Sequence, residues 1–390
     1  MNDNFIAALS ELSWSDLENQ ERPIFLYDLS QIGTTVKKIR MAAKALNQDA
    51  RLFYSLKCNP HLPIVQRMAD LVDGFDVSSD AELRFRGEIG IPGHRISISG
   101  PGKTDDLLRR SSRVDVGVVH IDSLQELAVA GEVGCRNISY RILLDEVSSR
   151  KLGMTTADCR TAYTAWKGRA VGLHAYLGRE SFSWDRLRST LATMQVLVEE
   201  HPEAYSDQLR FFVGPGFDIE LEAIGLPSFT TPIPIDFEVG RALMASVGVY
   251  ACRVLAVKTV GRGLRQIIVN GGLQHLASPF VSLSRPRQVA GVQAIRGGKV
   301  LNGERAEFVV SGSLCLGHDV LHPRVEISDQ VERGDWLLFS NAGAYGFTAG
   351  VPCFIGQDLP REFTFSDQSE IVETTNSAFL MYHSGFGDFR

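Results

Sequence analysis

Residues 51–60 read RLFYSLKCNP, a β-rich run that ends at a lysine, Lys57, and a turn. Similar short runs recur until about residue 240, with helix-length amphipathic stretches between them. The predicted strands are RLFYSL (51–56), GFDVS (74–78), RISIS (95–99), VGVVHID (116–122), SYRILL (139–144), AVGLHAYL (170–177), LRFFVG (209–214) and IPIDFEV (233–239). Strands that alternate with helices in this way predict an α/β fold, a parallel (β/α)8 TIM-like barrel.

The helical stretches carry their own signals. In Asp185–Glu200 the apolar residues fall on one face, and Thr104 and Ser123 precede two further stretches as predicted N-caps. The eighth strand has weaker support, because Pro232 and Pro234 lie beside it and no clear helix follows it.

After Gly240 the pattern changes to strands without helical spacers. The predicted strands there are Val247–Val260 and the runs 265–272, 306–314 and 335–343. We expect the early run Pro23–Tyr27 to pair with them. The sequence therefore predicts a barrel over residues 28–242 and an antiparallel β domain, sandwich-like or barrel-like, formed by residues 1–27 and 243–390.

Composition excludes several classes of protein. The 390 residues carry a net charge of −6, which offers no electrostatic attraction to nucleic acid or an anionic membrane. The acidic segment Met1–Glu21 is unlike a signal peptide, and no apolar run is long enough to span a bilayer. The six cysteines are scattered, without a CxxC pair, which favours reduced thiols in a cytoplasmic protein and no structural metal.

Functional groups of such a barrel project from the carboxyl ends of its strands. Lys57, Asp76, His174 and Tyr176 lie there, and Glu238 ends the eighth strand. A lysine at the mouth of a dry pocket can become a nucleophilic amine, although a surface lysine is the alternative. Glu238 could face a pyridine nitrogen, or it could form an ion pair at a domain junction.

Three further segments are candidates for ligand binding. The turn Gly214-Pro215-Gly216 could present N–H groups to a phosphate, which Arg241 could also reach, or it could be a plain loop. Cys315 lies in a loop with Asp319 and is either reactive or inert. Tyr345 lies among small residues in NAGAYGFT, where a ligand could approach closely.

Taken together, these segments resemble the alanine-racemase-like (fold type III) pyridoxal-phosphate decarboxylases, which act on diaminopimelate, ornithine or arginine. The resemblance covers about Pro23 to Gly346, and its motifs occur in the family's order. They are YSLKCNP (54–60), GFDVSSDAEL (74–83), GLHAYLG (172–178), VGPGF (213–217), FEVGR (237–241), GSLCLGHDVL (312–321) and NAGAYGF (341–347).

The resemblance implies a carboxy-lyase that uses pyridoxal 5'-phosphate and forms a homodimer with shared active sites. Lys57 would carry the cofactor as a Schiff base, Glu238 would pair with the pyridine nitrogen, and Cys315 of the partner subunit would protonate the carbanion. The implied cofactor-binding residues are Lys57, Asp76, His174, Tyr176, Gly214, Gly216, Glu238, Gly240, Arg241 and Tyr345. The implied substrate residues are Cys315, Leu316 and Asp319.

The sequence departs from the family at positions that bear on the substrate. Tyr176 replaces a ring-stacking histidine, and Arg179 stands where a phosphate-binding serine is usual. Leu316 replaces an acidic residue that pairs with a distal ammonium, and Asn270 replaces a common aspartate. We therefore predict that lysine, ornithine and diaminopimelate are not the preferred substrates. With a tyrosine at this position, the strand resembles that of family members in siderophore or antibiotic pathways, whose substrates are conjugated or carrier-bound.

Two rival functions follow from the same residues. A pyridoxal-phosphate racemase on this scaffold would need two opposed bases, but enzymes of that type place an arginine at the pyridine nitrogen, where this chain has Glu238. A non-catalytic pyridoxal-phosphate carrier is usually a single barrel, so the Cys315 and Tyr345 segments argue against it.

Overall fold

The computed structural model describes residues 5–6, 8, 22–144, 152–166, 168–178, 182–217, 225–276, 291–352, 354–366 and 370–374. It divides into two compact units. The barrel unit comprises Thr35–Lys57 and Val65–Ala242, and the β unit comprises the described residues up to Thr34, Cys58–Ile64 and those from Leu243 onward. No helix in the described part of the chain is long and apolar enough to cross a membrane.

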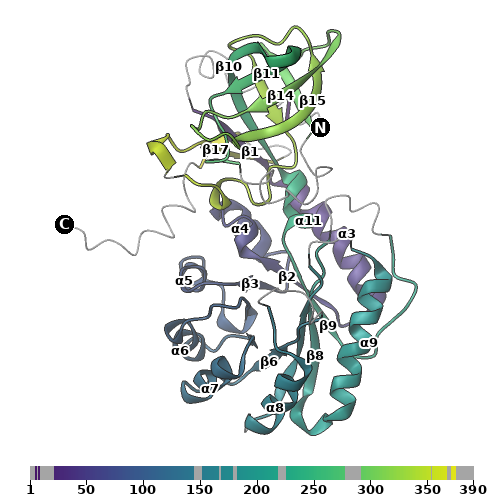
Figure 1. Cartoon of the computed structure of the whole chain (residues 1–390). Coiled ribbons are helices and arrows are strands. Elements are labelled where there is room, and N and C mark those ends of the chain that lie inside the picture. The colour runs from purple at the N-terminus through teal and green to yellow at the C-terminus, as the bar shows by residue number, and fades with distance from the viewer. Residues whose placement is uncertain are drawn as a thin grey trace, which may run out of the picture. The chain divides into compact units, whose positions relative to one another are not determined.

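Eight parallel strands close the barrel, each hydrogen-bonded to the next (Figure 1). They are β2 (Arg51–Ser55), β3 (Gly74–Val77), β4 (Ile96–Ile98), β5 (Val118–Ile121), β6 (Ile138–Arg141), β7 (Ala170–Tyr176), β8 (Tyr205–Gly214) and β9 (Ile235–Val239). Pairing of β9 with β2 completes the ring, with Phe53 opposite Glu238. The predicted fold class is confirmed, including the eighth strand beside its prolines.

Helices follow most of the strands, in the order that the periodicity predicted. They are α3 (Ser30–Leu46), α4 (Leu62–Ala69), α5 (Asp80–Glu88), α6 (Asp105–Arg113), α7 (Leu124–Glu132), α8 (Thr156–Ala165) and α9 (Trp184–Glu200). The hydroxyls of Thr104 and Ser123 accept the N–H groups of Leu107 and Glu126, so both predicted N-caps are confirmed. Only one helical turn, α11 (Arg241–Met244), follows β9 directly.

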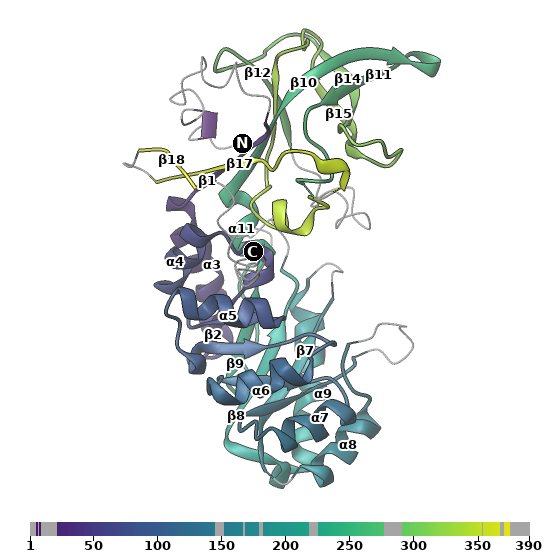
Figure 2. The same cartoon turned by 90° about the vertical axis from the view of Figure 1, so that its left-hand side faces the viewer.

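The β unit is a ten-stranded sheet built around β10 (Gly248–Val260) (Figure 2). Its other strands are β1 (Ile24–Asp28), β11 (Leu264–Val269), β12 (Val292–Arg296), β13 (Lys299–Val300), β14 (Arg305–Ser311), β15 (Val320–Ser328), β16 (Trp336–Phe339), β17 (Arg361–Phe365) and β18 (Val372–Glu373). As expected, the early run pairs with the later domain, Ile24 lying opposite Ala251. Most pairs are antiparallel, as predicted, and two pairs, β1–β17 and β11–β14, are parallel.

The chain leaves the barrel unit directly after Lys57, which lies in a short 3-10 turn behind β2. The next residues belong to the β unit, where the Asn59 side chain donates to Gly343 O at 2.9 Å. The Cys58 carbonyl accepts the Tyr345 N–H at 2.8 Å. Within the β unit, these two contacts join Cys58–Ile64 to the loop that carries Tyr345.

Candidate active site

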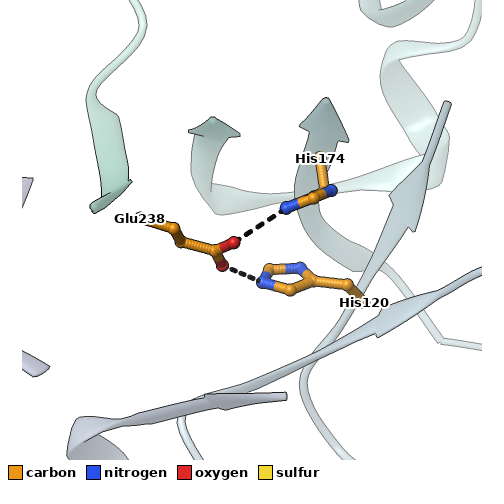
Figure 3. Close-up of side chains that lie close together, drawn as sticks. All are labelled: His120, His174 and Glu238. Atoms are coloured by element: carbon orange, nitrogen blue, oxygen red, sulfur yellow. Dashed lines mark hydrogen bonds and ion pairs between the residues drawn. The ribbon is translucent and has the colours of Figure 1, made fainter. Parts of the chain in front are cut away.

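The barrel interior contains a buried cluster of polar side chains around Glu238 (Figure 3). Glu238 Oε1 accepts His120 Nε2 at 2.8 Å and Ser97 Oγ at 3.2 Å, and Oε2 accepts His174 Nε2 at 3.0 Å. The donors come from β4, β5 and β7, while Glu238 comes from β9. Since barrel interiors are usually filled with branched apolar residues, this polar layer marks a candidate site.

The cluster carries one negative charge. Burial raises the pKa of Glu238, but its contacts with the N–H groups of His174 and His120 outweigh burial, so the pKa lies well below its usual range. Burial lowers the pKa of His174 to about 3, which leaves that imidazole neutral at physiological pH. The result is a buried carboxylate surrounded by hydrogen-bond donors, an arrangement that attracts a cationic ligand group.

His120, His174 and Glu238 each offer a possible metal-ligating atom, and these atoms lie within 4.8 Å of one another. The direct nitrogen–oxygen contacts of 2.8 and 3.0 Å, however, are hydrogen-bond distances. A bound ion would have to separate these partners. The geometry therefore favours a hydrogen-bonded carboxylate over a metal centre.

A second group surrounds Lys57. Its Nζ donates to Asp76 Oδ2 at 2.5 Å and lies 3.4 Å from Ser78 Oγ, and Asp76 Oδ1 accepts Ser99 Oγ at 2.6 Å. Asp76 is buried, whereas the Lys57 side chain is 42% exposed. An accessible amine beside a fixed carboxylate can bind a carbonyl group and pass its proton to a defined acceptor.

The turn after β8 has a backbone that requires glycine at two positions, Gly214 and Gly216. Gly216 has φ +69, and a side chain there would place a Cβ 2.2 Å from Gly178 O. A Cβ at Gly214 would lie 2.8 Å from the Tyr176 ring, which is 37% exposed. Only glycine therefore lets this turn approach both the β7 loop and Tyr176, and a turn without Cβ atoms can bring its backbone close to an anion.

Gly240 and Arg241 lie two and three residues after Glu238, and Arg241 begins α11. Gly240 is buried and Arg241 is half-buried. Glu238 and His174 are in contact, as are Lys57 and Asp76. Cys315, Leu316, Asp319 and Tyr345 lie in the β unit. Arg179 lies outside the described residues.

In the β unit Asp319 organises the loop that carries Cys315. Its carboxylate oxygens accept the Leu273 and Leu314 N–H groups, both at 2.8 Å, and the side chain is buried. Cys315 is exposed and Leu316 half-buried on the same loop. These contacts favour a structural role for Asp319, and its direct contact with substrate stays a prediction.

Tyr345 has an unusual backbone, with φ +53, in the left-handed region that non-glycine residues rarely adopt. Its N–H donates to Cys58 O at 2.8 Å. Tyr345 is thereby fixed to the residue that follows Lys57 in the chain. Its predicted contact with the cofactor phosphate stays a prediction.

Sequence reasoning missed His120, Ser97 and Ser139, which complete the Glu238 cluster, and Glu82 near Lys57. A signal for His120 was present: a lone polar residue inside the apolar run VGVVHID. Side chains of a barrel strand alternate between the interior and the helices, so a buried polar residue there needs partners inside the barrel.

These groups fit pyridoxal phosphate. The cofactor has a pyridine nitrogen that is cationic when protonated, an aldehyde and a phosphate, and the barrel unit offers an anionic Glu238, the Lys57 amine and a glycine turn. His174 Nδ1 is also buried without a hydrogen-bond partner among the described residues, as expected of a site completed by a ligand.

The family model described as "Pyridoxal-dependent decarboxylase, pyridoxal binding domain" matches residues 32–222, the span that contains most of these groups. The chain belongs to the pyridoxal-dependent decarboxylases. It is thus a pyridoxal-phosphate-dependent carboxy-lyase, as the motifs predicted.

Curated relatives of this decarboxylase align over most of its length. It is 24% identical to the diaminopimelate decarboxylase of Campylobacter jejuni, with 84% of this chain and 86% of the relative covered. It is 24% identical to the 2-[(L-alanin-3-ylcarbamoyl)methyl]-2-hydroxybutanedioate decarboxylase of Staphylococcus aureus, with coverage of 91% and 97%. Identity to the L-glutamyl-[BtrI acyl-carrier protein] decarboxylase of Niallia circulans is 23%, with coverage of 94% and 92%.

Solved structures agree on the fold of this decarboxylase. The diaminopimelate decarboxylase of M. jannaschii superposes with a TM-score of 0.76 at 18% identity, with 93% of this chain and 91% of that chain covered. The arginine decarboxylase of Paramecium bursaria Chlorella virus gives a TM-score of 0.76 at 19% identity, with coverage of 92% and 100%. At these identities the likeness extends to the fold alone.

Glu82 makes the stability of the decarboxylase depend on pH. Burial raises the pKa of Glu82 from 4.5 to about 7, although its Oε2 accepts the Ser78 N–H at 2.6 Å. The folded protein therefore binds more protons than the unfolded chain between these values, and this contribution to stability is lost as pH rises through that window. We expect the unfolding free energy of Glu82→Gln, relative to the parent, to rise by about 3 kcal/mol from pH 4.5 to 7.

Urea unfolding at a series of pH values measures this difference. Glu88→Gln removes an exposed carboxylate of the same helix and serves as the matched control. If the unfolding free energies of Glu82→Gln and the parent changed with pH in parallel, the raised pKa of the buried Glu82 carboxyl would be contradicted.

Proposed function

We propose that this decarboxylase removes the α-carboxyl group of an amino-acid conjugate or carrier-bound amino acid in specialised biosynthesis. The observation that carries the proposal is the ionised Glu238, held by His120, His174 and Ser97 inside the barrel. A fixed anion beside a pyridine nitrogen keeps that nitrogen protonated. Pyridoxal phosphate, when bound, then supplies an electron sink for the pair released as carbon dioxide leaves.

Lys57 is the proposed residue that holds the cofactor covalently. Its Nζ carries a proton toward Asp76 Oδ2, 2.5 Å away, and this carboxylate is the nearest acceptor when the amine reacts. Ser99 Oγ donates to the other Asp76 oxygen and fixes the carboxylate in position. Asp76 thus orients Lys57 and stores the proton that the amine must lose and regain.

The glycine turn and two side chains form the proposed phosphate site. Gly214 and Gly216 present backbone without an obstructing Cβ, and Arg241 and Tyr345 are the proposed side-chain donors. Tyr176 lies against Gly214 and takes the position of the family's stacking histidine. An aromatic ring there can pack on the cofactor but carries no positive charge at neutral pH.

Cys315 is the proposed donor of the proton that replaces the carboxyl group, acting from the partner subunit of a homodimer. Support comes from its exposure on a loop that the buried Asp319 holds in shape. An exposed thiol on a firmly held loop suits a group that must reach a ligand on another surface.

The substrate proposal rests on Leu316, next to Cys315. Its apolar side chain cannot pair with the distal ammonium of a diamino acid. Two relatives aligned over nearly their full length act, by their names, on a conjugate and on a carrier-protein-bound glutamyl group. A larger substrate of this kind places neutral atoms near Leu316.

The covalent link is tested by reduction. Reconstituted protein should absorb near the band of a lysine-bound pyridoxal, and borohydride should fix the cofactor on Lys57, as identified by peptide mass spectrometry. Lys57→Ala should carry no reduced adduct, whereas Lys103→Ala, which changes a buried lysine paired with Glu126, should still be labelled at Lys57. A colourless protein with Lys57 unlabelled would overturn the proposal.

The shared active site predicts complementation between two inactive variants. Lys57→Ala and Cys315→Ala homodimers should each be nearly inactive, but random mixing should restore about a quarter of parental activity, because half of the dimers contain one intact site. Activity is measured after co-refolding at equal concentrations. Failure of the mixture to exceed either variant, while chromatography shows dimers, would refute the shared site.

The substrate class is tested with a panel of free and conjugated amino acids. We expect kcat/KM for lysine, ornithine and diaminopimelate to be at least about 100-fold below that for an amide-linked or carrier-bound substrate. Release of carbon dioxide with chiral analysis of the amine separates decarboxylation from racemisation. Efficient turnover of any free diamino acid would disprove the assignment.

A further inference from the structure

His120 lies in the barrel core, outside the sequence motifs of the family resemblance, and so far has no assigned role. Its Nε2 contacts Glu238 Oε1 at 2.8 Å, and its Nδ1 contacts Ser139 Oγ at 2.5 Å. His120 and Ser139 are both fully buried. Both ring nitrogens of His120 therefore have a partner within the barrel.

The direction of the hydrogen bond between His120 and Glu238 follows from the charge on Glu238. An ionised carboxylate only accepts, so His120 Nε2 carries the proton and donates. Nδ1 lies 2.5 Å from Ser139 Oγ, and a hydroxyl can either donate to the ring nitrogen or accept from it. A chain of hydrogen bonds links Ser139, His120 and Glu238, and it fixes the orientation of the His120 ring.

His174 is held differently. Its Nε2 also donates to Glu238, but its Nδ1 has no partner among the described residues. The two imidazole rings lie 4.3 Å apart between centroids, and the His120 ring also packs against Phe212 at 4.9 Å. His120 is thus fixed at both nitrogens and by packing, whereas His174 is fixed at one nitrogen.

We propose that His120 is a positioning residue that holds Glu238 ionised and aimed at the pyridine nitrogen of the cofactor. Burial alone would favour protonated Glu238, and a protonated carboxyl could not neutralise a cationic ring. His120 supplies a charge-assisted hydrogen bond from β5 that counteracts burial. This inference rests on the proposed placement of pyridoxal phosphate at Glu238.

The test measures cofactor affinity by titrating the apoenzyme with pyridoxal phosphate. We expect His120→Leu, which keeps an apolar side chain in the core, to raise the Kd about 10- to 100-fold, the effect of losing a hydrogen bond to a charged group. His120→Gln places an amide donor where Nε2 lay and should restore the Kd to within about threefold of the parent. Ser139→Ala should weaken binding only a few-fold, because His120 keeps its bond to Glu238.

A merely structural role gives a different pattern. In that case His120→Leu and His120→Gln would weaken binding equally, or the Kd would follow the melting temperature of the apoenzyme. Equal losses, or a His120→Leu Kd within twofold of the parent, would overturn the inference. His94→Gln, at an exposed histidine of the same unit, should change neither quantity.

Two further comparisons between variants keep the test decisive. If His120→Leu does not fold, a Ser139→Ala Kd equal to that of the parent together with lost affinity in His120→Gln overturns the inference. Glu238→Gln separates it from the proposed function: weakened binding in Glu238→Gln with intact binding in His120→Leu refutes only the role of His120. Unchanged binding in both variants refutes the placement of the cofactor at Glu238.

Discussion

The barrel unit depends on one constraint, the burial of an ionised carboxylate. Taking Glu238 out of water costs several kcal/mol unless its lone pairs are satisfied by well-placed donors. The donors come from β4, β5 and β7, three strands that are brought around β9 only when the sheet closes. Closure of the barrel and ionisation of Glu238 therefore support each other, and the residue most costly to bury is also the one best placed to bind a cation.

Strand register makes this arrangement possible. Ser139 lies opposite His120, and Arg141 lies opposite His174, so neighbouring strands present polar groups to the same layer of the interior. Because side chains alternate along a strand, a slip of one residue would turn His120 toward the helices and an apolar neighbour inward. The apolar residues that flank each polar one hold the register, and the polar ones form the site.

The sequence predicted the order of the strands better than their partners. Alternating apolar runs and cap residues such as Thr104 are local signals, and all eight barrel strands followed from them. The parallel pairing of β1 with β17 was missed because it joins segments more than 300 residues apart. His120 was missed for a related reason: its position inside an apolar run shows that it needs a partner, but its partner Glu238 lies 118 residues away.

The ionised Glu238 also bears on the replacement of the family's stacking histidine by Tyr176. With Tyr176 in place of a histidine, the ring beside the glycine turn contributes packing and no positive charge. With His174 neutral, this donor contributes a hydrogen bond to Glu238 and no positive charge. A cationic ligand group would balance the charge of Glu238, so the proposed affinity for a protonated pyridine depends on the neutral state of His174 as well as on Glu238 itself.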